Sequence, residues 1–203
     1  MAEERGRRPG NPRTKEQILT AAIESFVAHG YGGTTIRAVA RAAGVDPALV
    51  MHFFGSKDGL FAAAIKESMP VTLMVEAIDG DEAHIAERLA ARYLSLWEDP
   101  AHGPTLKAVL QAAAATPAAA DLLKDLMRTE LLGPLMRNLS QDHAELRTLL
   151  AASHMIGLAM MRYVLKVEPL ASTPAHLVAA AVAPALQRYL TGTLTLAETA
   201  DSR

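Results

Sequence analysis

The stretch TTIRAVARAAGVDPALVMHFFGSK, residues 34–57, decides the fold. Apolar side chains recur at helical spacing both before and after Gly44. Gly44 is expected to end the first helix, and Asp46 is a good N-cap for the second. Pro47 suits the first helical position, where a missing N–H costs nothing. The pattern predicts two short helices joined by a turn of about three residues that contains a glycine, which is typical of a helix-turn-helix.

A longer helix is expected to precede this pair, and a fourth helix is expected to follow it. Residues 14–17 (TKEQ) fit a capping box that would start the first helix. Gly30 lies where a left-handed residue would end that helix. Thr34 or Thr35 can cap the next helix, and Ser56 can cap the fourth.

Spacing alone allows two interpretations of the short pair. In a helix-turn-helix, the turn holds the second helix at a steep angle, so that its outer face can enter a major groove about 12 Å wide. Val50 and Phe54 would then hold this helix onto the others, and Ala48, Met51 and His52 would face outward. The alternative is a helical hairpin packed inside a larger bundle.

A more specific signal lies in the identity of the residues across this region. The residues that carry it are Ala22, Phe26, Gly30, Tyr31, Thr34, Thr35, Ile36, Ala40, Ala43, Gly44 and Val45, followed by Phe54, Gly55, Ser56, Lys57, Asp58 and Leu60. This run resembles the N-terminal domain of the tetracycline-repressor (TetR) family, nearly continuously over residues 14–65. The resemblance implies a bacterial homodimer that binds a pseudo-palindromic operator and releases it when a small ligand enters the C-terminal domain.

Carried over by position, the resemblance implies eight residues that contact DNA. Thr35 and Arg37 would meet the DNA backbone at the start of the second helix, and Lys57 would contact a phosphate. The remaining five lie on the recognition helix: Pro47, Ala48, Leu49, Met51 and His52. Met51 replaces a tyrosine that many family members have, and methionine cannot make the tyrosine's hydrogen bond to phosphate. The operator sequence therefore does not follow from the resemblance.

The distribution of charge removes an objection to DNA binding. The formal net charge of −2 by itself argues against a strongly basic nucleic-acid-binding protein. Residues 1–60, however, carry eight basic and six acidic side chains, and most of this excess lies in residues 1–15, with five basic against two acidic. We expect residues 1–13 to be a flexible basic arm that increases the salt dependence of DNA binding. A merely solubilising terminus is the alternative.

The sequence beyond residue 60 predicts further helices and a partner subunit. Apolar periodicities interrupted by proline and glycine predict helices over residues 81–98, 105–115, 116–139, 144–167 and 174–190. Gly133-Pro134 is expected to bend or interrupt the third of these, and Thr173-Pro174 to cap the last, in which Pro184 is expected to cause a kink. Apolar character extends well around the 144–167 helix, which indicates burial on more than one side and hence a second subunit.

The resemblance likewise implies that the last two long helices, 144–167 and 174–190, pair across a twofold axis. Such an axis would place two recognition helices about one DNA turn, roughly 34–36 Å, apart.

Large, adaptable apolar side chains are the candidates for an effector pocket. They are Met69, Met74, Trp97, Met127, Met136, Met155 and Met160. Methionine suits irregular ligand shapes, so an apolar or amphipathic small molecule is expected, although ordinary core filling is the alternative for each residue.

Enzyme chemistry has no residue pattern to support it. The seven histidines lack metal-ligand spacing, the chain has no cysteine, and no nucleophile-elbow, phosphate-loop or dinucleotide-binding motif occurs. We therefore expect no catalysis, no metal and no cofactor.

The composition and the positions of the glycine, proline and capping residues together predict an all-α fold. The 203 residues include 39 alanines and 27 leucines, both strong helix formers. We expect about nine helices, arranged as a three-helix helix-turn-helix domain followed by a larger helical ligand-binding and dimerisation domain. The predicted boundaries are a flexible arm over 1–13, the DNA-binding domain over 14–60, the helical domain over 61–192 and a tail over 193–203.

The expected function is a cytoplasmic, ligand-responsive DNA-binding regulator, most simply a repressor. The N-terminal residues lack the apolar stretch of about 7–15 residues that a signal peptide needs, and no run approaches the roughly 20 apolar residues of a membrane span. The alternatives are an activator, a regulator without ligand, and an all-helical small-molecule carrier whose N-terminal domain is vestigial.

Overall fold

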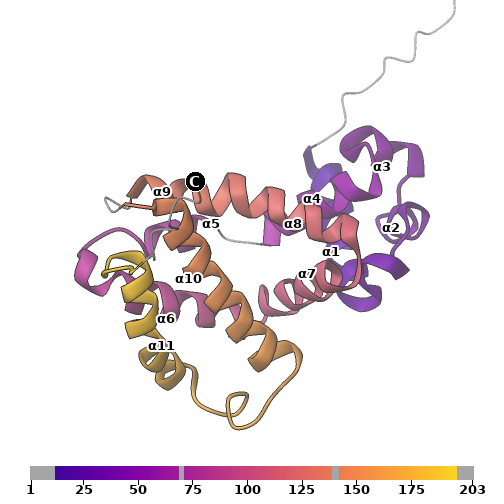
Figure 1. Ribbon diagram of the computed structural model, residues 1–203. Helices are drawn as coiled ribbons and strands as arrows, with labels where there is room; N and C mark the ends of the chain where they lie inside the picture. Colours follow the sequence, from indigo (N-terminus) through magenta and orange to yellow (C-terminus); the bar gives the residue numbers. More distant parts are fainter. Residues whose placement is uncertain (1–11, 69–70, 139–141, 196–203) are drawn as a thin grey trace, which may run out of the picture. The chain divides into compact units, whose positions relative to one another are not determined.

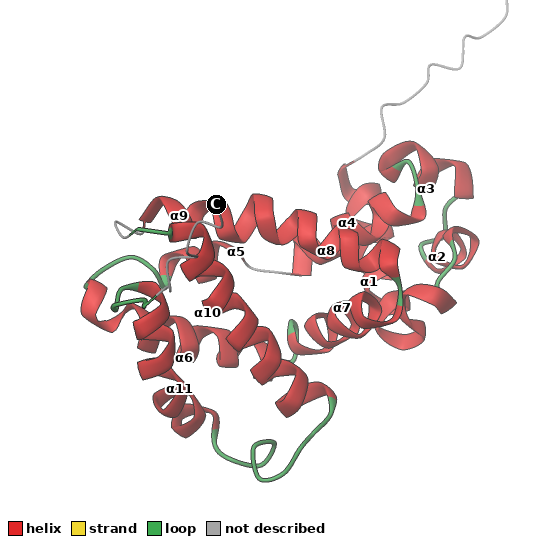
Figure 2. Ribbon diagram, in the orientation of Figure 1, coloured by secondary structure: helices red, strands yellow, loops and turns green. Residues whose placement is uncertain are grey.

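The computed structural model describes residues 12–68, 71–138 and 142–195, which fold into helices joined by turns and loops (Figure 1, Figure 2). Within these ranges there are eleven α-helices, α1–α11, a 3-10 turn η1 and two π-helical segments, η2 and η3, and no strand. The all-α prediction is confirmed. Residues 1–11 of the predicted arm, residues 196–203 of the predicted tail, and Met69 lie outside the described residues.

The described residues form two compact units. The first contains residues 12–68 and 104–124, and the second contains residues 71–103 and 125–195 apart from 139–141. The two helices beyond the expected nine are α5 (Val71–Glu76) and α9 (Gly133–Asn138). The second of these exists because the predicted 116–139 helix is divided.

The first unit begins with α1 (Pro12–Gly33), which packs against both α2 (Ile36–Ala42) and α4 (Lys57–Ser68). Between them α3 (Pro47–Phe54) contacts α2 and α4. α7 (Gly103–Ala115) and α8 (Pro117–Leu126) supply the rest of this unit. The largest side chains buried in the N-terminal helices are Ile18, Phe26, Val39, Val50, Leu60, Phe61 and Ile65.

The start of α1 differs from the prediction, whereas the glycine break agrees with it. The helix begins at Pro12, because proline is tolerated at a first helical position, so Thr14 lies inside the first turn and is not the cap. Gly30 has φ 67° and ψ 177°, which kinks α1 and turns the chain toward α2. Gly44 also has a positive φ, 66°, as a left-handed residue at the end of a helix should.

The second unit is built around α6 (Ile85–Glu98), α10 (Ala144–Ala159) and α11 (Ala175–Leu190), which contact one another and lie side by side in Figure 1. Their shared core is a single cluster of buried apolar residues that includes Ile85, Leu89, Leu94, Met155, Val178, Leu186 and Leu190. The helix expected over 81–98 is present as η1 (Glu82–His84) followed by α6.

Two of the predicted long helices contain a π-helical segment. η2 (Met127–Leu132) lies between α8 and α9, directly before Gly133-Pro134, where α9 begins. Proline lacks an N–H and its ring clashes with the carbonyl four residues earlier, so a widened turn is a reasonable accommodation at this position. η3 (Met160–Val164) continues α10, and the helix ends before Lys166, which has φ 55°.

The predicted cap of the last helix is wrong. α11 has Pro174 at its N-cap position and no side-chain cap hydrogen bond. The hydroxyl of Thr173 instead donates to the Pro169 carbonyl at 2.8 Å, so it is not directed at the amides of α11.

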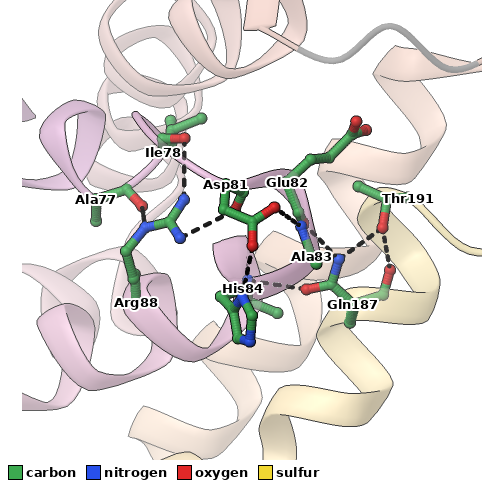
Figure 3. Close-up of polar contacts among 10 residues, drawn as sticks. Ala77, Ile78, Asp81, Glu82, Ala83, His84, Arg88, Gln187 and Thr191 are labelled. Carbon is green, nitrogen blue, oxygen red and sulfur yellow. Dashed lines mark hydrogen bonds and ion pairs between the residues drawn. The ribbon is translucent and has the colours of Figure 1, made fainter.

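A polar network joins the start of α6 to the end of α11 (Figure 3). Arg88 donates to three backbone carbonyls of the preceding segment: those of Ala77 (3.1 Å), Ile78 (3.4 Å) and Asp81 (2.9 Å). From α11, Gln187 accepts from the Ala86 amide at 3.1 Å and donates to the Glu82 carbonyl at 2.8 Å. These bonds satisfy backbone groups that the short, broken helices around residue 80 leave unpaired.

Candidate DNA-binding site

The α3 helix is an eight-residue element with a defined start, a defined end and one fully buried anchor. Asp46 is its N-cap and accepts a hydrogen bond from the Ala48 amide at 2.7 Å, with Pro47 in the first turn. Gly55, with φ 71°, ends it. Val50 has 0% of its surface exposed, which fixes α3 to the unit.

The opposite side of α3 is open to solvent. Met51 is 44% exposed, and Pro47, Ala48 and His52 are also exposed. Leu49 is half-buried, so it is the least accessible of the five predicted recognition-helix residues. The outward orientation predicted for Ala48, Met51 and His52 agrees with this burial pattern.

The start of α2 uses one of the two candidate threonines as its cap. The hydroxyl oxygen of Thr35 accepts from the Ala38 amide at 3.1 Å, and both Thr35 and Arg37 are exposed. Thr34 is buried instead, and its hydroxyl lies 2.9 Å from the Gly30 carbonyl and 3.2 Å from the Ser25 hydroxyl. Thr34 therefore fixes the corner between α1 and α2 and leaves Thr35 for the cap.

At the start of α4, Lys57 lies beside Tyr31, a contact that the sequence did not predict. Ser56 accepts from the Gly59 amide at 2.9 Å, as expected of a cap. The Nζ atom of Lys57 lies 4.4 Å from the centre of the Tyr31 ring. The Tyr31 hydroxyl donates to Oδ1 of Asp58. Burial, and then this hydrogen bond and charge, raise the pKa of Tyr31 to about 12.

A second lysine lies near the end of α3. The Nζ atom of Lys15, in the first turns of α1, is 5.9 Å from the centre of the Phe54 ring. This contact places the beginning of α1 beside the last residue of α3. Lys15 and Phe54 are 39 positions apart in the sequence, so only folding brings them together.

Comparison with known proteins places both parts of this chain in one family. Residues 18–64 match the profile for bacterial regulatory proteins of the tetR family, and residues 83–190 match the tetracyclin repressor-like C-terminal domain. The chain belongs to the TetR family. The helices α2 and α3 are therefore its helix-turn-helix, and the resemblance drawn from residues 14–65 is confirmed.

A solved TetR-family regulator from Streptomyces coelicolor A3 is similar over nearly its whole length. It is 36% identical with a TM-score of 0.67, and the alignment covers 92% of this chain and 99% of that one. Among curated relatives, the HTH-type transcriptional regulatory protein RaaS of Mycobacterium tuberculosis is 43% identical over 75 residues, covering 30% of this chain and 35% of RaaS.

The HTH-type transcriptional regulator BetI of Burkholderia thailandensis is 27% identical over 112 residues, which is 46% of this chain and 57% of BetI. The chain thus matches only about a third to somewhat more than half of the length of these curated relatives.

The candidate effector residues of this TetR-family chain fall in different environments. Met155 belongs to the buried core of the second unit, and Met74 packs against that core. Met127, Met136 and Met160 are half-buried. These positions are compatible with core filling and with a pocket, and the assignment to a pocket stays a prediction.

Trp97 lies in an aromatic and charged cluster that the sequence did not predict. Its ring stacks on Tyr163 at 5.1 Å and meets Tyr93 edge to face at 6.0 Å. Arg162, on η3, is buried and donates to Glu98 at 3.0 Å and to the Leu170 carbonyl. Burial raises the pKa of Tyr93 and of Tyr163 above the ordinary value for tyrosine.

Within residues 12–68, 71–138 and 142–195, no group of three or more His, Asp or Glu side chains could hold a metal ion. No single helix in these ranges is both long and apolar enough to cross a membrane. Pro47–Phe54 and Lys57–Glu67, which are bent by 68° relative to each other, reach that length and composition only as a pair.

Proposed function

We propose that this chain is a ligand-responsive transcriptional repressor that binds a pseudo-palindromic operator as a homodimer. The observation that carries the proposal is the construction of α3: it is capped at its start, fixed by the fully buried Val50 and exposed at Ala48, Met51 and His52. A helix held this way can enter a major groove without unfolding or repacking its own domain.

The exposed side chains suit the two kinds of contact that operator binding needs. Ala48 and Met51 offer apolar contacts to thymine methyl groups, and His52 can exchange hydrogen bonds with base edges. The exposed Arg37 and the half-buried Lys57 supply cations for phosphates, which position the protein without reading sequence. The Thr35 oxygen already accepts a backbone hydrogen bond, so its O–H is directed elsewhere and can donate to a phosphate.

Support for a homodimer comes from the distribution of exposed apolar side chains. Of the eight large apolar residues exposed in the described ranges, Val27 and Met51 lie in the first unit. The other six lie between residues 146 and 177: Leu146, Leu149, Met161, Leu165, Val167 and Leu177. Six exposed apolar side chains in α10, η3, the segment after η3 and α11 favour a subunit contact in this part of the chain.

Small residues on α10 leave room for a helix of a second subunit to approach closely. On α10, the exposed residues Ser153 and Gly157 lie between Leu149 and Met161, at helical spacing. A Cβ atom added at Gly157 would meet nothing within 4 Å. We assign the dimer to residues 144–167 and 174–190 of each subunit, related by a twofold axis that presents two copies of α3 to successive major grooves.

The ligand step is proposed to act on the spacing of those two helices. A small apolar or amphipathic effector would bind within residues 61–192 and favour a dimer whose α3 helices no longer match the operator. It can do so only to the extent that it binds one state more tightly than the other. The chain passes from the DNA-binding helices to the second unit at the end of α4, so α4 is the proposed connection.

The test begins with selection of DNA from a random duplex pool by the purified full-length chain. Recovery of a palindromic sequence, and weaker binding of it by the Arg37→Ala, His52→Ala and Lys57→Ala variants, is the expected result. Addition of 8-anilinonaphthalene-1-sulfonate, an amphipathic probe, tests whether a bound small molecule weakens the complex. A chain that binds the probe but enriches no DNA would be a small-molecule carrier, and the proposal would be wrong.

A further inference from the structure

The side chain of Lys57 lies in an unusual electrostatic position. It is the first residue of α4, and a cation at the N-terminus of a helix is opposed by the positive end of the helix dipole. Asp58, the next residue of the same first turn, carries the carboxylate nearest to Lys57 in the sequence. The structure instead places Nζ of Lys57 over the Tyr31 ring, and the Asp58 carboxylate accepts the Tyr31 hydroxyl.

Tyr31 is held rigidly enough to act as a fixed support. Its ring meets Phe61 edge to face at 4.9 Å and lies nearly parallel to Phe26, at 6.3 Å and 9°. Phe26 and Phe61 are each 2% exposed, so this pair belongs to the core of the unit. The kink at Gly30, immediately before Tyr31, directs the chain so that the tyrosine reaches the start of α4.

We propose that Tyr31 is a positioning residue for the phosphate contact of Lys57. Its ring supports the ammonium group, and its hydroxyl binds the neighbouring carboxylate that would otherwise pair with that group. The inference rests on the proposed function, since it gives a role in operator binding to a residue outside the eight predicted DNA contacts.

The chemistry of the two contacts explains why this arrangement favours phosphate binding. An aromatic face attracts a cation through its quadrupole without occupying the cation in a charge-assisted hydrogen bond. The ammonium therefore keeps its N–H donors for a phosphate oxygen, which a salt bridge to Asp58 would engage. A lysine side chain has large rotational freedom, and a preformed support reduces what is lost when the phosphate binds.

The experiment is a double-mutant cycle on operator affinity, measured by fluorescence anisotropy across a series of salt concentrations. The variants are Lys57→Ala, Tyr31→Leu and the double variant, in the full-length chain with the selected operator. Lys57→Ala should reduce the slope of log affinity against log salt by about 0.9 for each half-site. Tyr31→Leu should weaken binding by about two- to fivefold for each half-site, and should have no further effect once Lys57 is absent.

Two more variants distinguish the effect of the Tyr31 ring on operator affinity from the effect of its hydroxyl. Tyr31→Phe keeps the ring but frees the Asp58 carboxylate, so its affinity should fall, and a second change, Asp58→Asn, should restore it. Ile18→Val is the matched control, because it removes buried packing from the same unit at a residue outside the aromatic group around Tyr31. It should lower the melting temperature and leave the salt slope unchanged.

The outcomes distinguish this inference from the proposed function. Equal effects of Tyr31→Leu with and without Lys57 would mean that Tyr31 acts only through folding, and would overturn the inference. Failure of Asp58→Asn to restore Tyr31→Phe would remove the role of the hydroxyl. An unchanged affinity in Lys57→Ala would overturn the inference while leaving operator binding intact. A wild-type chain that binds no DNA would overturn the proposed function itself.

Discussion

Arg147 is a buried side chain whose hydrogen bonds should contribute strongly to the free energy of unfolding, so its substitution should clearly destabilise the second unit. It lies on α10, is 2% exposed, and donates to groups from two other segments. Its Nη1 atom contacts the carbonyls of Tyr189 at 3.0 Å and Gly192 at 2.8 Å, at the C-terminal end of α11. Its Nε and Nη2 atoms contact the carbonyl and carboxylate of Asp142 at 2.7 and 2.8 Å.

The expected cost of Arg147→Met follows from these four hydrogen bonds. Methionine fills a similar volume but has no donor, so the last carbonyls of α11 lose their partner. Asp142 is largely exposed and its oxygens can return to water, so its two bonds contribute less than the two bonds to the end of α11. A bond to a charged donor contributes about 1.5–3 kcal/mol, and removal of a buried guanidinium recovers part of its desolvation cost. The net loss should be about 2–4 kcal/mol.

The assay is thermal unfolding followed by circular dichroism, with all variants at one protein concentration. For a chain of this size each kcal/mol lowers Tm by roughly 2–4 °C, so the melting temperature should fall by about 5–15 °C. Arg92→Met, an exposed arginine on α6, is the matched control and should stay within about 0.5 kcal/mol of wild type. A melting temperature for Arg147→Met equal to that of Arg92→Met would refute the reasoning.

Four other changes should have outcomes of known sign. Gly157→Ala should favour the α10 helix by up to about 1 kcal/mol in the isolated subunit but weaken the proposed dimer, so sedimentation equilibrium should show more monomer; an unchanged dimer would place the interface elsewhere. Asp46→Ala removes the cap of α3 and should cost about 1 kcal/mol in denaturant unfolding, with weaker operator binding. The hydrogen bond from Arg147 lowers the pKa of Asp142 below its ordinary 3.8. The stabilisation from this bond is therefore present above pH 3.8 and is lost as the pH falls through the lowered pKa. Wild type should lose more stability on acidification than Arg147→Met, which acid titration of the circular dichroism signal can test. Deletion of residues 1–12, which carry Arg5, Arg7 and Arg8, should lower operator affinity and flatten its salt dependence, and an unchanged slope in a polarisation assay would exclude this role for the arm.

Features set by residues close together in the chain were predictable from the sequence. The caps at Thr35, Asp46 and Ser56 and the glycine breaks at Gly30 and Gly44 all act on backbone groups within a few residues. Each has a strong local signature, so residues 34–57 are enough to predict where the two short helices begin and end.

The remaining features depend on contacts between distant segments. Tyr31 and Lys57 are 26 positions apart, and Arg147 reaches carbonyls 42 and 45 positions away. Nothing in the local pattern of either residue indicates its partner, because that partner is chosen by the packing of whole helices. Thr173 shows the opposite case. The local sequence predicts that it caps α11, but its hydroxyl donates to the Pro169 carbonyl instead.

The single buried anchor of α3 has a consequence for engineering. Because Val50 is the one residue of this helix with its side chain fully inside the unit, the exposed positions carry almost no packing constraint. A library randomised at Ala48, Met51 and His52, with Asp46 and Val50 retained, should therefore consist mostly of folded members. If α3 reads the operator as proposed, changing these three side chains should redirect operator preference while the rest of the DNA-binding domain stays the same.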